Sequence, residues 1–398
     1  MHRYYSYLLK PTEQHLELLK QFGGARRFLW NRMLEYNDIH YKETGKFLWY
    51  YDMIGNLPNL KIENPWLNDI PSQAIQQVLK DLDQTLKVFC KNKDVGFPKY
   101  KKKYDNNDNI RIPQMNGHIK PNKSGLKIPK IQDPIKWIKH RPLEGLLKSI
   151  TLKQDGDKWY CSCLCELPDK EPLLEVDIKD IVGIDLGIKD FAVTSDGEVI
   201  ESCRYYRKNQ KKLKRKQRQL AKARRSSNKR LKRKKEVRII HKKIANQRKD
   251  FHHKLSNSIA NDYKFVGLED LNIKGMMQNH NLAKAIQDQG WSSFANMLAY
   301  KTNVIWVDRW YPSTKTCSCC GDKKNMTLDI RTYVCASCGN TMNRDLNASF
   351  NIKDWVVDKL NRTGAVQIYG QGDNELSLSM NCQKFPIFDK EARSFRAE

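Results

Sequence analysis

Residues 181–200 read IVGIDLGIKDFAVTSDGEVI, and this stretch decides the fold expected for the chain. Ile181–Leu186 is a nearly continuous apolar run, which is typical of a buried strand. The FAVTSDGEVI that follows has the pattern of a strand, an Asp-Gly turn and another strand, so it can pair with the first run. Asp185 lies late in the first strand, where a buried strand reaches the surface.

Two further acids lie in comparable settings. Glu269 ends a second apolar run, FVGLE, and Asp345 lies where a loop enters a helix expected from about Leu346. A strand, a long crossover and a second strand predict parallel neighbours, so Asp185 and Glu269 are expected at one end of the same sheet. The helix after Asp345 can deliver the third acid there. Each acid alone is also compatible with a surface charge or a helix cap, and Asp345 suits an N-cap.

Three gathered carboxylates predict a metal-dependent hydrolase. Clustered carboxylates repel one another, so a cation is expected among them, and hard oxygen ligands favour magnesium or manganese over zinc. Two such ions about 3.5–4 Å apart can activate water and stabilise the leaving oxygen of a phosphodiester. Phosphodiester hydrolysis is therefore the expected chemistry.

Two CxxC turns predict a structural zinc site. Cys317 and Cys320 form the first turn, Cys335 and Cys338 form the second, and each turn is followed by glycine. Four thiolates at this spacing close a tetrahedral zinc site and leave no position for water. The alternatives are disulfides and a ligand swap between Cys320 and its neighbour Cys319. A separate alternating group is expected only to pack on one face of a strand. This group consists of Cys161, Cys163 and Cys165.

The charge of the chain predicts a polyanionic partner. Lys and Arg number 72 against 45 acids, which gives a formal net charge of +27 over 398 residues. Nucleic acid is favoured over a membrane surface because no apolar run approaches the roughly 20 residues of a membrane span. The expectation is a soluble, intracellular protein, cytoplasmic and associated with the nucleoid.

The densest basic segment is 207–254, where about half of the residues are Lys or Arg and the opposing acids are Glu236 and Asp250. Apolar residues at helical spacing predict a folded helical hairpin with its turn at 226–228. A solvated helix face is the alternative, but one-signed charge repels itself unless phosphates neutralise it. The expected nucleic-acid contacts are Lys211, Lys212, Lys214, Arg215, Arg218, Arg224 and Arg225.

The remaining sequence divides into helical and strand-like parts. Apolar residues recur at helical spacing from Pro11 to about Cys90, including a second run, SQAIQQVLKDLDQTLKVFC. Short alternating stretches from Lys120 to about Pro168 predict a small β-barrel or sheet. The segment after Trp355 has few periodic apolar residues, so a loose tail is expected.

Taken together, these motifs resemble the TnpB family, the nucleases encoded by insertion sequences and related to type V CRISPR effectors. The motifs GIDLGIKDFAVTSDG, KIANQRKDFHHKLS, GLEDLNIKGM, YPSTKTCSCCG, YVCASCG and NRDLNASFNI follow in the family's order between Ile181 and Ile352. GARRFLWNRMLEYN and FPKYKKK add weaker support. Two positions depart from the family pattern. Asn343 replaces an aspartate, and Ala348-Ser349 replaces Ala-Ala.

The resemblance implies an RNA-guided DNA endonuclease and assigns the site residues. By motif match Asp185, Glu269 and Asp345 are the catalytic acids that hold Mg²⁺ or Mn²⁺, and the four cysteines of the CxxC turns hold Zn²⁺. A guide RNA from the transposon end would pair with double-stranded target DNA beside a short flanking motif. The helix with Gln73 and Gln77 is a candidate reader of that motif, because glutamine can contact adenine with two hydrogen bonds. A plain helix surface is the alternative, and the expected assembly is a monomer with RNA.

The implied fold is multidomain α+β. It has a RuvC/RNase H-like α/β nuclease domain with an inserted zinc ribbon, a small β-barrel wedge domain and a helical recognition domain. The expected boundaries are wedge 1–10 and 106–178, recognition 11–105, nuclease 179–316 and 339–356, zinc ribbon 317–338, and flexible tail 357–398.

Three other functions fit parts of this pattern. A non-catalytic nucleic-acid-binding regulator would use the same fold, but retention of all three acids argues against it. A miniature type V CRISPR effector differs in gene neighbourhood rather than in any residue. A transposase would use similar acids for strand transfer, but the resemblance is to the accessory nuclease.

Overall fold

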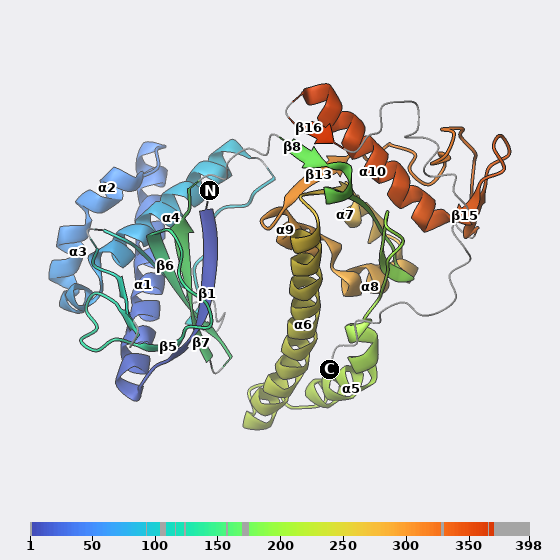
Figure 1. The fold of residues 1–398 in the computed structure, drawn as a ribbon. Coiled ribbons are helices and arrows are strands. Elements are labelled where there is room, and N and C mark those ends of the chain that lie inside the picture. The colour runs from blue at the N-terminus through green and yellow to red at the C-terminus, as the bar shows by residue number, and fades with distance from the viewer. Residues whose placement is uncertain are drawn as a thin grey trace. The chain divides into compact units, whose positions relative to one another are not determined.

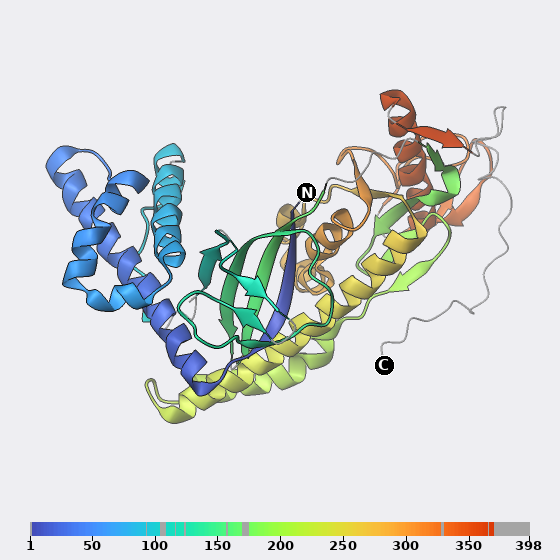
Figure 2. The same ribbon diagram turned by 60° about the vertical axis from the view of Figure 1, so that its left-hand side comes forward.

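The computed structural model describes residues 2–92, 94–103, 109–115, 117–122, 125–156, 158–168, 175–327, 330–364 and 366–369. The chain forms two compact units, residues 1–171 and residues 172–398. Figures 1 and 2 show each unit in two orientations. No described helix combines the length and apolar character that crossing a membrane requires.

The first unit contains an antiparallel sheet in the order β2-β6-β7-β1-β5. The first strand of the chain lies inside it, because β1 pairs with β7 and β5. A two-stranded sheet, β3-β4, accompanies it. The strands are β1 (His2–Lys10), β2 (Ile110–Pro113), β3 (Lys120–Pro121), β4 (Leu126–Lys127), β5 (Lys136–Ile138), β6 (Leu146–Asp155) and β7 (Lys158–Glu166).

Helices pack with this sheet around one core. In α4 the apolar side chains recur every three or four residues, and those from Ala74 to Leu86 are buried. The predicted packing role of Cys161, Cys163 and Cys165 is confirmed, since all three are buried in this core. The helices are α1 (Glu13–Thr44), α2 (Tyr50–Gly55), α3 (Leu57–Glu63), the 3₁₀ helix η1 (Pro65–Asp69) and α4 (Ser72–Lys91).

The second unit contains a mixed sheet in the order β11-β10-β9-β12-β13. Strands β9, β12 and β13 are parallel, whereas β10 is antiparallel to β9 and to β11. The predicted opening strand and hairpin are therefore confirmed. The strands are β8 (Glu175–Asp177), β9 (Ile181–Leu186), β10 (Asp190–Thr194), β11 (Val199–Glu201), β12 (Phe265–Glu269), β13 (Asn303–Val307), β14 (Thr332–Val334), β15 (Thr341–Asn343) and β16 (Gln367–Tyr369).

The helices of the second unit cover both faces of this sheet (Figure 1). Val182 and Ile184 pack with residues of α6 and α9 in one core cluster. Ile181 packs with Val356 and Leu360 of α10 in another. The helical segments are η3 (Ile178–Asp180), α5 (Tyr205–Ala221), α6 (Asn228–Asp262), α7 (Ile273–Met276), α8 (His280–Gln289), α9 (Trp291–Ala299) and α10 (Arg344–Thr363).

The basic segment forms a helical hairpin, as predicted. Helices α5 and α6 run side by side in Figure 2, and Leu213, Ile240 and Ile244 are buried between them. The turn spans 222–227. Helix α6 is one continuous helix of 35 residues, from Asn228 to Asp262.

Two sequence expectations need correction. The second unit begins at 172 and includes β8, whereas the sequence placed residues up to 178 in the preceding segment. The tail does not begin at 357, because buried Val356, Val357 and Leu360 continue α10 to Thr363 and β16 then pairs with β8. The rest of the predicted tail, 370–398, lies outside the described residues.

Candidate active site and zinc cluster

Asp185 and Glu269 end two neighbouring parallel strands. In the pairing of β9 with β12, Ile184 lies opposite Leu268, so the two acids follow at the same level. Side chains alternate along a strand, so both acids share the face of Gly183 and Gly267. The predicted placement of both acids at one end of a parallel pair is confirmed.

Helix α10 lies directly on that face because the two glycines have no side chains. A Cβ atom on Gly183 would lie 2.1 Å from the carbonyl oxygen of Ser349 and 2.5 Å from the nitrogen of Lys353. A Cβ atom on Gly267 would lie 2.7 Å from Cγ2 of Ile352. This close approach brings the N-terminus of α10, with Asp345, to the ends of β9 and β12.

Asp345 lies in the first turn of α10 but is not its N-cap. The helix begins at Arg344, and the Asn343 side chain accepts hydrogen bonds from the backbone nitrogens of Asp345 at 2.8 Å and Leu346 at 3.3 Å. The N-cap interpretation of Asp345 is therefore wrong. The Asp345 carboxylate instead forms ion pairs with Arg344 at 3.3 Å and Arg331 at 3.5 Å.

The three acids interact electrostatically. Burial raises the pKa of Asp185 well above its usual range, the charges of Glu269 and Asp345 raise it further, and Arg344 opposes them. Burial also raises the pKa of Glu269, and a hydrogen bond from Ser313 opposes that effect. A cation among these carboxylates would offset both the burial and the repulsion.

Burial and this repulsion together predict that Asp185→Asn stabilises the metal-free protein at neutral pH. A raised folded-state pKa gives stability that is present below the unfolded pKa and is lost as pH rises through the folded pKa. Ionisation of Asp185 at pH 7 therefore favours the unfolded chain, and asparagine, which cannot ionise, removes this effect. Thermal unfolding in magnesium-free buffer should show a higher Tm for the variant at pH 7. The gain should shrink below about pH 4, near the ordinary aspartate pKa. An equal or lower Tm at pH 7 would contradict this.

The carboxylate oxygens of the three acids do not lie close enough together to surround a single ion. Within the described ranges, one group of three or more His, Cys, Asp or Glu has ligand atoms all within 4.8 Å of one another, and it consists of the four cysteines. The acids therefore share one end of the sheet without forming a compact ligand set. The two arginines engage Asp345 in this arrangement.

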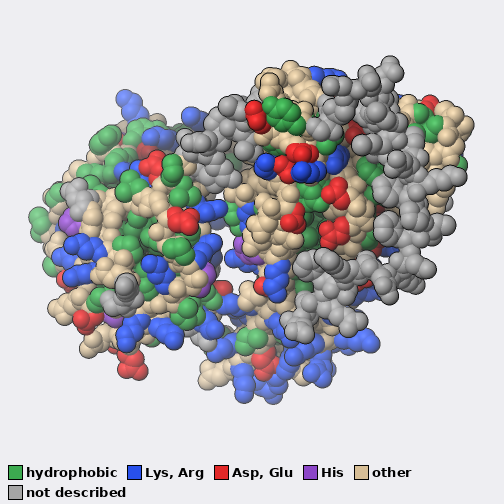
Figure 3. All heavy atoms as spheres, in the orientation of Figure 1, with side chains coloured by type: hydrophobic (Ala, Val, Ile, Leu, Met, Phe, Trp, Pro, Cys, Tyr) green, Lys and Arg blue, Asp and Glu red, His purple; other side chains and the backbone are tan. Residues whose placement is uncertain are grey.

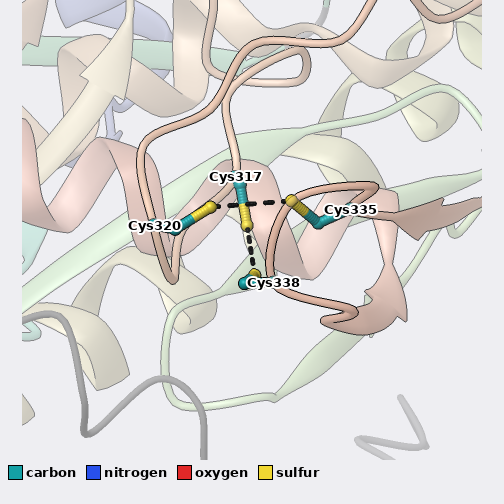
Figure 4. Close-up of side chains that lie close together, drawn as sticks. All are labelled: Cys317, Cys320, Cys335 and Cys338. Atoms are coloured by element: carbon teal, nitrogen blue, oxygen red, sulfur yellow. Dashed lines mark hydrogen bonds between the residues drawn. The ribbon is translucent and has the colours of Figure 1, made fainter.

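The four predicted cysteines converge (Figure 4). Sγ of Cys317 lies 3.7 Å from Sγ of Cys338, and Sγ of Cys320 lies 3.6 Å from Sγ of Cys335. A tetrahedral ion with Zn–S bonds of about 2.3 Å requires about 3.8 Å between sulfurs. All four are free cysteines, which argues against the disulfide alternative, and Cys319 is outside the group. The donor set and spacing fit structural zinc.

The predicted cations on the basic hairpin are all exposed. Figure 3 shows Lys and Arg side chains gathered over α5 and the start of α6. Five cations of α5 and its C-terminal end, with Gln219, line a groove; they are Lys211, Lys214, Arg215, Arg218 and Lys222. Glu236 is paired with Lys216 and Arg233, so it offsets little of the charge at the groove.

The two candidate glutamines lie on α4 in the first unit. Both are half-buried, and Gln77 donates a hydrogen bond to Asp81 at 2.8 Å. The pairing with Asp81 occupies the amide that Gln77 would offer to a base. The assignment of Gln73 and Gln77 as readers of DNA stays a prediction.

Sequence reasoning missed three residues that contact the acids. Ser313 donates a hydrogen bond to Glu269, and Arg331 and Arg344 pair with Asp345. The sequence marks two of them only by their location, because Ser313 lies inside the motif YPSTKTCSCCG and Arg344 inside NRDLNASFNI.

The chain matches the models of three known protein families. The family OrfB_IS605, described as "Probable transposase", matches residues 162–280, which include Asp185 and Glu269. The "Cas12f1-like, TNB domain" matches 291–352, which include the four cysteines and Asp345. The "Helix-turn-helix domain" HTH_OrfB_IS605 matches 1–46.

Individual relatives cover most of the chain. "Putative RNA-guided DNA endonuclease InsQ" of Escherichia coli (strain K12) is 32% identical, over 87% of this chain and 90% of that protein. "TnpB-like protein L79" of Acanthamoeba polyphaga mimivirus is 30% identical over 55% of this chain and 46% of that protein. The chain belongs to the TnpB family. A "Putative RNA-guided DNA endonuclease" of Streptomyces pristinaespiralis is 28% identical to this TnpB-family chain, over 88% of each protein.

A solved structure supports the fold of this TnpB-family protein. The chain in a cryo-EM structure of a Cas12f1-sgRNA-target DNA complex matches with a TM-score of 0.54 and 18% identity, over 86% of this chain and 83% of that one. The protein thus has an α+β fold of the kind found in Cas12f1. The resemblance to TnpB seen in the sequence is confirmed.

Proposed function

We propose that this protein is an RNA-guided DNA endonuclease with a RuvC-like nuclease domain in its second unit. The observation that carries the proposal is the placement of Asp185, Glu269 and Asp345 at one end of the sheet, in a chain of the TnpB family. The related proteins of Escherichia coli and Streptomyces are named for this activity. The parallel β9-β12-β13 core flanked by antiparallel β10 and β11 is consistent with an RNase H-like sheet.

The three acids would hold Mg²⁺ or Mn²⁺. When bound, two such ions supply a water nucleophile and stabilise the leaving oxygen of a phosphodiester. Asp185 and Glu269 are fixed by adjacent strands, and Asp345 is fixed by α10. In the metal-free arrangement, Arg331 and Arg344 pair with Asp345 and offset the negative charge of its carboxylate. A bound cation would replace them in this role.

The other parts of the chain have distinct roles in this proposal. The second unit would hold the nuclease segments and the zinc ribbon, whose zinc is structural. In the first unit, the sheet built from β1 and strands after 106 would be the wedge, and α1 to α4 would be the recognition domain. The partners would be a guide RNA from the transposon end and double-stranded target DNA, with one protein copy in each complex.

The test is cleavage by the protein purified with its RNA. The copurified RNA is sequenced, and DNA that matches its guide segment is presented beside randomised flanking sequences. Cleavage in magnesium that stops when magnesium is omitted is expected. No cleavage across the whole flanking library would overturn the proposal and favour a binding regulator.

The groove on α5 is expected to bind phosphates of the nucleic-acid backbone. Replacing Lys211, Lys214 and Arg218 by glutamine should weaken RNA binding. The RNA association constant falls with salt, and the magnitude of its log–log slope should decrease by about 1 for each phosphate that is no longer neutralised. Filter binding over a salt series measures both. The charge-preserving variant K211R/K214R/R218K is the control and should keep the slope. An unchanged slope in the glutamine variant would remove α5 from the interface.

A further inference from the structure

A buried serine contacts the second acid of the candidate site. The hydroxyl of Ser313 donates a hydrogen bond to Oε1 of Glu269, and Ser313 is 3% exposed. Ser313 lies after β13, 44 residues beyond Glu269 in the sequence. This hydrogen bond lowers the pKa of Glu269 against the effect of burial, so it favours the charged carboxylate.

Helix α10 holds the backbone around Ser313 in place. Nδ2 of Asn351 donates to the carbonyl oxygens of Ser313 at 2.6 Å and Thr316 at 2.7 Å. Nδ2 of Asn347 also donates to Thr316 at 2.7 Å, and its Oδ1 accepts from the backbone nitrogen of Ser318 at 3.0 Å. Both asparagines are buried. Because Asn347 is two residues from Asp345, the same helix turn fixes the third acid and this segment.

The zinc cluster is continuous with the same segment. Cys317 lies between Thr316 and Ser318, the two residues whose backbone atoms bind Asn347. Its backbone nitrogen donates to Asp322 at 2.8 Å, which closes the first CxxC turn. Between the two CxxC turns lies Arg331, which pairs with Asp345 at 3.5 Å. The segment before the first CxxC turn thus contacts Glu269 through Ser313, and the segment before the second contacts Asp345 through Arg331.

We propose that Ser313 is a positioning residue for Glu269 and that the zinc cluster holds it there. We call residues 311–318 the clamp segment. The Ser313 hydroxyl fixes Oε1 of Glu269 and leaves Oε2 for a cation, while Cys317, Asn347 and Asn351 fix the backbone of the segment. The proposal rests on the function proposed above, because it treats Glu269 as a metal ligand. It adds that zinc binding controls the affinity of the acids for their cation.

The first test measures Mn²⁺ binding without catalysis. Complexes of protein and copurified RNA are titrated with Mn²⁺ in the absence of DNA, and free Mn²⁺ is read by electron paramagnetic resonance. Ions held by RNA are subtracted with the Asp185→Asn complex. Loss of a group that orients a metal ligand costs about 10- to 100-fold in metal affinity. We expect that loss in Ser313→Ala, with a matching rise in the magnesium concentration needed for half-maximal cleavage.

Two variants make this result specific. Ser349→Ala removes another buried hydroxyl, which donates to Leu346 inside α10, and should bind Mn²⁺ as wild type does. Ser313→Thr keeps the hydroxyl and should recover most of the affinity. Zinc content and Tm are measured for each variant. If Ser313→Ala loses zinc or folds poorly, the threonine variant decides. A folded Ser313→Thr protein with Mn²⁺ affinity near wild type supports the clamp, and one with affinity at least tenfold weaker opposes it.

The second test asks whether zinc acts through Ser313. Zinc is removed from wild type and from Ser313→Ala, and Mn²⁺ affinity is measured for all four states. Two changes that act through one contact are not additive, so zinc removal should weaken Mn²⁺ binding less in the variant than in wild type. Additive losses would overturn the coupling between zinc and Glu269.

The outcomes separate this proposal from the one on which it rests. If the wild-type complex neither binds site-specific Mn²⁺ nor cuts matching DNA, the proposed function fails. If the wild-type complex does both, and Ser313→Ala binds Mn²⁺ as tightly as Ser349→Ala, only the clamp fails.

Discussion

Asp185→Asn is expected to abolish DNA cleavage while RNA binding stays unchanged. Asp185 is the most buried of the three acids, and the charges of both Glu269 and Asp345 act on its carboxylate. Asparagine keeps the size of the side chain but removes the negative charge that would hold the cations. Loss of groups that merely orient a metal ligand costs about 10- to 100-fold in affinity, so loss of a ligand should reduce the cleavage rate by more than about 100-fold.

The rate is measured in single-turnover assays at saturating magnesium, with RNA content determined for each preparation. Asp262→Asn is the matched control, because Asp262 is exposed and precedes β12, at the opposite end of the sheet from Glu269. The control should cut at the wild-type rate. Residual cleavage by Asp185→Asn within tenfold of wild type would remove Asp185 from the metal site.

Cys335→Ser is expected to release zinc and to disrupt the segment from Cys317 to Asn343. This segment has a small core of its own, with buried Tyr333 packed among Cys317, Cys319 and Cys335. So few apolar contacts cannot hold a fold alone, and structural zinc contributes on the order of 10 kcal/mol in zinc-finger peptides. Proteolysis should therefore cut within the segment, and the Tm should fall.

Zinc content by atomic absorption is the direct measurement, with one ion per chain expected in the wild type. Cys319→Ala is the control, because Cys319 lies in the same turn but outside the group of four. It should retain zinc. Zinc retained by Cys335→Ser and lost by Cys319→Ala would show that the ligand set is different.

The strands and acids were predictable because their signals are local. The apolar run before Asp185 and the run before Glu269 each specify a buried strand, and the long crossover between them specifies parallel pairing. The CxxC spacing likewise specifies its own geometry. These features need only a short stretch of chain and the rules of sheet topology.

The contacts that complete the site were not predictable from local patterns. Ser313 contacts Glu269, and Arg331 contacts Asp345, only after the sheet, α10 and the four-cysteine cluster have packed together. Helix α10 starts at Arg344, before the expected Leu346, because the side chain of Asn343 caps it. Helix α10 continues to Thr363, beyond the expected end at 356, because Val356, Val357 and Leu360 are buried; their apolar pattern is too short to stand out beside the polar tail.

In the proposed function, RNA selects the DNA that this protein cuts. The most direct measurement replaces the guide segment of the copurified RNA with a new sequence and presents two DNAs that differ only in which guide they match. Cleavage should move to the DNA that matches the new guide and should be lost in the Asp185→Asn complex. Cleavage that ignores the guide, or that persists in the Asp185→Asn complex, would contradict this prediction.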